Sequence, residues 1–182
     1  MLAVNSGLDP RHLDRLRDSE FSAAMAPLFE GAPRFLARLA AGRPYGSAER
    51  LFERALEIAL AMAEEEQREL IDAHPRLGAA LGSVSALSYV EQGYDREAAG
   101  AAAEAERARV AAELARLNEA YERRFGFRYC VFVAGRPAAS LLADLETALL
   151  ADADDERRRA LGDVVAIARA RYRSLGGPEV SP

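Results

Sequence analysis

The spacing of proline, the residue that most reliably interrupts a helix, constrains this chain most strongly. Proline is absent between Pro75 and Pro137, and this stretch is rich in Ala, Leu, Glu and Arg, which favour helices. β-Branched residues, which favour strands, cluster only briefly there, at Val131 and Val133. The sequence therefore predicts an all-α fold with long helices between these two prolines.

Apolar residues recur at helical spacing along most of the chain. Residues 96–125 carry one continuous apolar stripe and predict a helix roughly 45 Å long. Residues 126–135 are apolar and are expected to be extended. Shorter helices are expected in residues 10–30 (two), 31–43, 48–63 continuing through 64–73, 87–92, 138–150 and 155–175. We expect a single-domain helical bundle of about eight or nine helices over residues 1–182, with flexible ends at 1–8 and 176–182.

Three local signals place helix ends. Asp9 before Pro10 is typical of an N-cap followed by proline at the first helical position. Ser47 is a second candidate N-cap. A helix that precedes His74 must end there, because a residue before proline is disfavoured in helical geometry.

Composition narrows the function classes. The chain has 182 residues, of which 50% are hydrophobic, and no apolar run approaches the roughly 18 residues that a membrane span needs. Its net charge of -5 argues against nonspecific binding to nucleic acid or to an anionic membrane. All 24 basic residues are Arg, which excludes a Schiff-base lysine and a Walker lysine.

Cysteine and histidine content and the two chain ends give expectations about metal binding and cellular location. Cys130 is the only cysteine, and together with two histidines it supplies too few ligands for a structural zinc site, so no metal is expected. A lone cysteine forms no internal disulfide, which suits a reducing compartment. No signal peptide or peroxisomal address is recognisable, so a cytoplasmic location is expected.

The two histidines, His12 and His74, are the candidates for acid–base chemistry near neutral pH. His12 is most simply a surface residue of a polar helix. His74 stands at a helix end held by Pro75, a position that projects a side chain from a rigid frame. From spacing alone, a capping or packed histidine is the more frequent role at such a helix end.

Two polar groups share helical faces. Ser88, Glu91 and Gln92 stand at i, i+3 and i+4, so they either converge on one ligand or form a solvated surface. Asn118 and Tyr121 are better explained as polar residues that tie their helix to a neighbouring loop.

Charged residues crowd the C-terminal region. Arg169, Arg171 and Arg173 offer guanidinium groups to a carboxylate, but one helix cannot point all three the same way, and most are interpreted as surface charges. The charges of residues 154–159 predict an acidic helix start followed by a solvated face.

Taken together, the motifs resemble the 2-oxo-4-hydroxy-4-carboxy-5-ureidoimidazoline (OHCU) decarboxylases of urate breakdown, nearly from end to end. The resemblance rests on the order and separation of short blocks: residues 43–45 (Arg-Pro-Tyr), 73–78 (Ala-His-Pro-Arg-Leu-Gly), 88–92 (Ser-Tyr-Val-Glu-Gln), 117–121 (Leu-Asn-Glu-Ala-Tyr), 124–127 (Arg-Phe-Gly-Phe) and 167–171 (Ile-Ala-Arg-Ala-Arg).

The resemblance implies an all-helical, dimeric, cofactor-free enzyme that converts OHCU into (S)-allantoin and carbon dioxide. It implies that His74 is the general acid/base and Glu91 its acidic partner. It further implies substrate-binding roles for Pro75, Ser88, Gln92, Arg171 with Arg169 as the alternative, and Tyr129 and Cys130, whose segment would offer backbone donors.

One departure from the family pattern keeps alternatives open. Many relatives carry Pro-Phe-Ile where this chain has Arg128, Tyr129 and Cys130, which bears on the pocket wall and on substrate preference. Alternatives are therefore a related cyclic ureide as the substrate, or a non-catalytic helical protein that binds ureides or assembles with ureide enzymes. Urate oxidase and hydroxyisourate hydrolase are the expected pathway partners, and a homodimer is the expected assembly.

Overall fold

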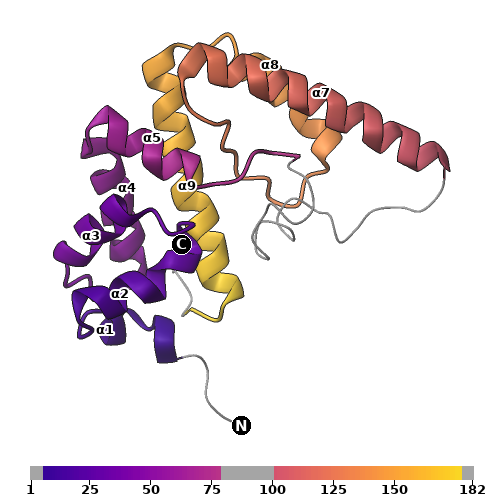
Figure 1. The fold of residues 1–182 in the computed structure, drawn as a ribbon. Coiled ribbons are helices and arrows are strands. Elements are labelled where there is room, and N and C mark those ends of the chain that lie inside the picture. Colours follow the sequence, from indigo (N-terminus) through magenta and orange to yellow (C-terminus); the bar gives the residue numbers. More distant parts are fainter. Residues whose placement is uncertain (1–5, 79–100, 178–182) are drawn as a thin grey trace. The chain divides into compact units, whose positions relative to one another are not determined.

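The computed structural model describes residues 6–78 and 101–177, and every regular element in them is helical (Figure 1). This confirms the predicted all-α fold. Eight α-helices lie in the described ranges: α1 (Pro10–Leu13), α2 (Asp18–Met25), α3 (Pro33–Ala41), α4 (Ala48–Ala61), α5 (Glu64–Asp72), α7 (Ala101–Phe125), α8 (Leu142–Ala148) and α9 (Ala153–Ser174). Single 3-10 turns stand at Ser6–Leu8, Ala26–Leu28 and Ala138–Leu141. The helix predicted over residues 87–92 lies outside the described residues.

The chain divides into two compact units. Unit 1 comprises Met1–Ala73 and Leu161–Pro182, and unit 2 comprises His74–Ala160. Helix α9 begins in unit 2 and continues into unit 1. That residues 1–182 form a single domain stays a prediction.

Unit 1 is built around α3, which packs against α2, α4 and α5. The buried side of α3 carries Phe35, Leu36 and Leu39, because these positions repeat at helical spacing. Tyr172 of α9 packs edge-on against Phe52 of α4, with ring centroids 5.3 Å apart. Aromatic and aliphatic side chains thus form the core of this unit.

The predicted N-caps at Asp9 and Ser47 are confirmed. The Asp9 carboxylate accepts hydrogen bonds from the backbone N–H groups of Arg11 and His12, at 2.8 and 3.3 Å. Ser47 Oγ accepts one from the Arg50 N–H at 3.2 Å. Each cap satisfies backbone donors that have no partner within the first helical turn.

The predicted continuation of one helix through residues 48–73 is wrong. Met62 and Ala63 have extended backbone conformations, with ψ values of 155° and 149°, and these two residues separate α4 from α5. The side chain of Gln67 in α5 donates to the carbonyls of Ala59 and Leu60 at 3.0 and 3.1 Å. These carbonyls lie in the last turn of α4, so Gln67 stabilises the point where the helix ends.

Unit 2 contains the long helix α7, which packs against α8. Gly126 ends α7 with a φ of 75°, a conformation that glycine adopts without steric cost. Residues 127–133 form neither helix nor strand, and residues 134 and 135 form a turn, so an extended conformation over residues 126–135 stays a prediction. Tyr121 of α7 packs against Phe125, Phe127 and Tyr129, with centroid distances of 4.6, 5.6 and 5.1 Å. These aromatic contacts hold the segment against α7.

Within the described residues, no helix is both long and apolar enough to cross a membrane.

Candidate active site

His74 lies just after α5, on a short turn that leads to Gly78. Helix α5 ends at Asp72, with Ala73 as its C-cap, as predicted from the proline that follows His74. His74 is 3% exposed, and Pro75 is half-buried. The side chain of His74 is therefore restricted by the residues packed around it, and its backbone is restricted by the following proline.

Side chains of helix α7 contact this turn at Leu77, Arg76 and Gly78. Asn118 Nδ2 donates to the Leu77 carbonyl at 2.9 Å, inside the core of unit 2. The Arg76 guanidinium forms two hydrogen bonds with the Glu122 carboxylate, one of them at 2.6 Å from Nε, which raises the pKa of Arg76 further. Gly78 has a φ of 77° and lies against the Leu114 side chain, whose Cδ1 would be 2.9 Å from a Cβ atom at this position. The turn that carries His74 is therefore anchored on α7.

Arg128 also binds the turn. Its Nη1 donates to the backbone carbonyl of His74 at 3.2 Å. Arg128 belongs to the segment after Gly126, so this bond joins His74 to the segment that carries Tyr129 and Cys130.

Tyr129 and Cys130 are both buried, at 2% and 3% exposure. The Arg159 guanidinium lies 5.0 Å from the centroid of the Tyr129 ring, and its Nη1 donates to the Cys130 carbonyl at 3.1 Å. The first turns of α9 thereby hold this segment in place. Whether its backbone contacts a substrate stays a prediction.

A buried polar network supports Arg159. The Glu156 carboxylate, 3% exposed, accepts hydrogen bonds from Arg159 Nη2 and from the Tyr121 hydroxyl, both at 2.6 Å. Burial, followed by this bond to a carboxylate, raises the pKa of Tyr121 far above its ordinary value. The acidic start predicted for this helix is confirmed, because Asp154, Asp155 and Glu156 lie in the first turn of α9. In the face predicted to be solvated, Arg158 is exposed, but Arg159 is partly buried by its bonds to Glu156 and to the Cys130 carbonyl.

Asn118 and Tyr121 have the structural roles that the sequence favours. Asn118 ties α7 to a neighbouring loop at Leu77, and Tyr121 ties it to Glu156 of α9.

Arg171 lies in unit 1, and its side chain is 1% exposed. Its Nη2 donates to Glu30 Oε1 at 2.8 Å, and its Nη1 donates to the Pro27 carbonyl at 3.1 Å. Of the three arginines that the sequence places mostly at the surface, Arg171 is therefore the buried one, whereas Arg173 is exposed and Arg169 is half-buried. The Arg169 guanidinium lies 5.5 Å from the centroid of the Phe52 ring. A substrate-binding role for either arginine stays a prediction.

The remaining predicted site residues, Ser88, Glu91 and Gln92, lie outside the described residues. Among the described ones, unit 2 holds His74 and Pro75 together with Tyr129 and Cys130, and Arg128 links the two groups.

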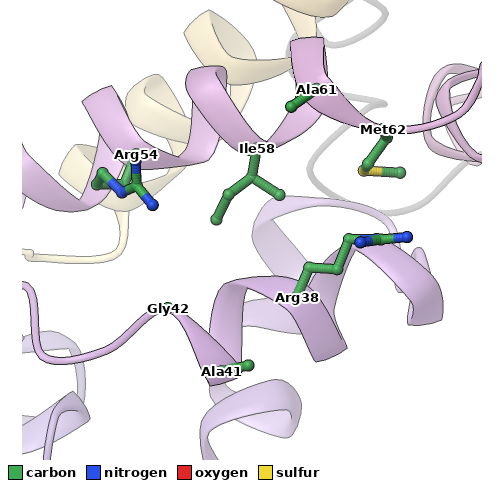
Figure 2. Close-up of a pocket in the computed structure, with 7 residues that line it drawn as sticks. All are labelled: Arg38, Ala41, Gly42, Arg54, Ile58, Ala61 and Met62. Carbon is green, nitrogen blue, oxygen red and sulfur yellow. The ribbon is translucent and has the colours of Figure 1, made fainter.

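A groove of 340 Å³ lies in unit 1, between the end of α3 and α4 (Figure 2). Ala41, Ile58, Ala61 and Met62 contribute apolar side chains to its lining, and Arg38 and Arg54 contribute guanidinium groups. Both guanidinium groups bind carboxylates, of Glu66 and Glu57 respectively. The groove shares no residue with the predicted site.

Sequence reasoning missed the contact partners Arg128, Glu156, Arg159 and Glu30. Arg128 carried a signal, because it stands where the family pattern changes. Glu156 and Arg159 carried a weaker one: their i, i+3 spacing pairs them on one helical face.

Comparisons with known proteins identify the family of this chain. The sequence model described as OHCU decarboxylase matches residues 14–173. The 2-oxo-4-hydroxy-4-carboxy-5-ureidoimidazoline decarboxylase of Haloferax volcanii is 29% identical over 164 residues, which cover 88% of this chain and 92% of that protein. The uric acid degradation bifunctional protein of Bacillus sp. (strain TB-90) is 24% identical, and the match covers 91% of this chain but 32% of that longer protein.

Two solved structures share the fold. A crystal structure of OHCU decarboxylase in the presence of (S)-allantoin superposes with a TM-score of 0.64 and 20% identity, covering 88% of this chain and 98% of that one. A crystal structure of (S)-allantoin synthase gives 0.65 and 19%, covering 92% of this chain and 53% of that one. Because the family match spans most of its length, this chain belongs to the OHCU decarboxylase family.

Proposed function

We propose that this protein is a carboxy-lyase that decarboxylates OHCU to (S)-allantoin and carbon dioxide in urate degradation. The observation that carries the proposal is the family match over residues 14–173, which includes His74 and the anchored turn around it. The Haloferax volcanii relative, similar over nearly its whole length, supports the same reaction.

The substrate's own structure explains how the reaction proceeds without a cofactor. The bond between the ring carbon and the carboxylate breaks, and its electron pair moves toward the neighbouring imine. This imine takes the place of the electron sink that pyridoxal phosphate or thiamine supplies elsewhere. The protein must then orient the substrate, favour loss of the carboxylate and deliver a proton to one face.

His74 is the proposed general acid/base that delivers this proton. Its burial keeps bulk water from competing, and the anchored turn fixes its backbone. Glu91 is the proposed acidic partner, and Ser88 and Gln92 are proposed to bind the ring and ureido groups. Pro75, the Tyr129–Cys130 segment and Arg171 complete the proposed binding set.

The cellular setting follows from the same proposal. The enzyme works in the cytoplasm as a homodimer, takes no metal or organic cofactor, and uses the product of hydroxyisourate hydrolase, which itself follows urate oxidase. Neither nucleic acid nor membrane is a partner, in keeping with the acidic net charge of -5.

The test generates OHCU in situ from urate with urate oxidase and hydroxyisourate hydrolase and follows its ultraviolet absorbance. The wild type is compared with H74A and with H12A, a matched control because His12 is exposed in α1. Circular dichroism of the backbone checks that each variant is folded.

The proposal expects fast OHCU decay with the wild type and H12A, and the spontaneous rate with folded H74A. Spontaneous decay with the wild type would overturn it. A panel of related cyclic ureides then separates a changed substrate from a non-catalytic protein.

A further inference from the structure

The side chain of Arg128 reaches the peptide of His74 itself. Its Nη1 donates to the His74 carbonyl at 3.2 Å, whereas the bonds from α7 engage the turn further along, at Arg76 and Leu77. Any shift of Arg128 therefore acts directly on the backbone that carries the histidine.

The residues that follow Arg128 are fixed independently. Arg159 binds the Cys130 carbonyl at 3.1 Å and lies over the Tyr129 ring, and the buried Glu156 holds Arg159. The segment around Arg128 is thus attached to α9 on one side and to His74 on the other. A cation bonded to a carbonyl in such a partly buried place makes a stronger hydrogen bond than a neutral donor does.

We propose that Arg128 is a positioning residue for His74, which fixes the histidine's backbone relative to the Tyr129–Cys130 segment. This inference rests on the proposed function, in which His74 is the catalytic residue. The bond does not touch the reacting atoms, so its loss displaces His74 and leaves the proton-transfer chemistry itself unchanged.

The test compares R128M, R128K and R124M. Arg124 is a matched control, because it also donates to a backbone carbonyl in unit 2, but to that of Ala151, at 3.0 Å, rather than that of His74. R128M should lower kcat about tenfold or more and change KM by less than about threefold, because a displacement of about 1 Å costs a catalytic group up to about 100-fold. R128K should recover most of the lost rate, and R124M should leave kcat unchanged.

A spectroscopic readout is independent of turnover. The chain has two histidines, so an imidazole ¹H–¹⁵N spectrum contains two spin systems, and H12Q assigns them. R128M should shift and broaden the His74 signals, and R124M should leave them in place.

The outcomes separate the two proposals. A wild-type kcat in R128M, a loss that R128K does not recover, an equal loss in R124M or unmoved His74 signals would each overturn the positioning role. If the wild type fails to accelerate OHCU decay but R128M still moves the His74 signals, the proposed function fails and the contact between Arg128 and His74 stands.

Discussion

The buried ion pair between Glu30 and Arg171 yields the sharpest stability prediction. The Arg171 side chain is 1% exposed and the Glu30 side chain 15% exposed, with 2.8 Å between Nη2 and Oε1. Removing one partner of a buried pair costs about 3–5 kcal/mol, because the other charge stays buried without compensation. E30Q keeps an acceptor oxygen and removes only the charge, so we expect it to lower the free energy of unfolding by about 2–3 kcal/mol.

Glutamine is chosen because Glu30 has a φ of 51°, a conformation that is strained for residues other than glycine. A glycine at this position would relieve that strain and so mask the loss of the ion pair. In R171M the remaining carboxylate reaches water more easily. The double variant should therefore lose less than the sum of the single losses, with a coupling energy of about 2 kcal/mol.

Urea unfolding, followed by far-ultraviolet circular dichroism, measures the free energy of unfolding of the wild type, E30Q, R171M and the double variant. E53Q is the matched control, because the Arg50–Glu53 pair is 3.4 Å long and both side chains are more than half exposed. It should change the free energy of unfolding by less than about 0.5 kcal/mol. A loss in E30Q as small as that of the control would refute the reasoning.

Three further predictions concern other elements. G78A should lose about 1–2 kcal/mol of stability in urea unfolding, because alanine is strained at a φ of 77° and Leu114 leaves little room; wild-type stability would contradict the stated geometry. Y121F should lose about 1.5–3 kcal/mol, the range for a hydrogen bond to a charged group such as Glu156, and a neutral result would mean that this bond contributes nothing net. Burial raises the pKa of Tyr45 to about 12, so its contribution to stability is complete below the unfolded value of about 10 and is lost as the pH rises through about 12. Unfolding at several alkaline pH values should show this loss, and a flat profile from pH 10 to 12 would contradict it.

The fold was largely predictable because its signals are local. Proline positions, capping residues and apolar spacing depend on neighbours in the sequence, so the ends at Asp9, Ser47 and His74 agree with the structure. The break at Met62 was not predictable in this way. It has no glycine or proline, and the carbonyls at the end of α4 are satisfied by Gln67, a side chain of the next helix.

The candidate site was predictable only as far as the family motif reaches. His74 stands out in the sequence through Pro75 and the surrounding block, but its anchors, Asn118 and Arg128, act through tertiary hydrogen bonds. Glu156 resembles its charged neighbours in the sequence. Packing alone decides that it is buried.

The chirality of the product tests the central claim most directly. OHCU formed from urate is fully converted with the wild type and, separately, by spontaneous decay, and the circular dichroism of the allantoin is recorded. Proton delivery by a fixed His74 predicts (S)-allantoin alone from the wild type and no signal from the racemic spontaneous product. Racemic allantoin from a reaction that the protein has accelerated would contradict delivery of the proton to one face of the substrate.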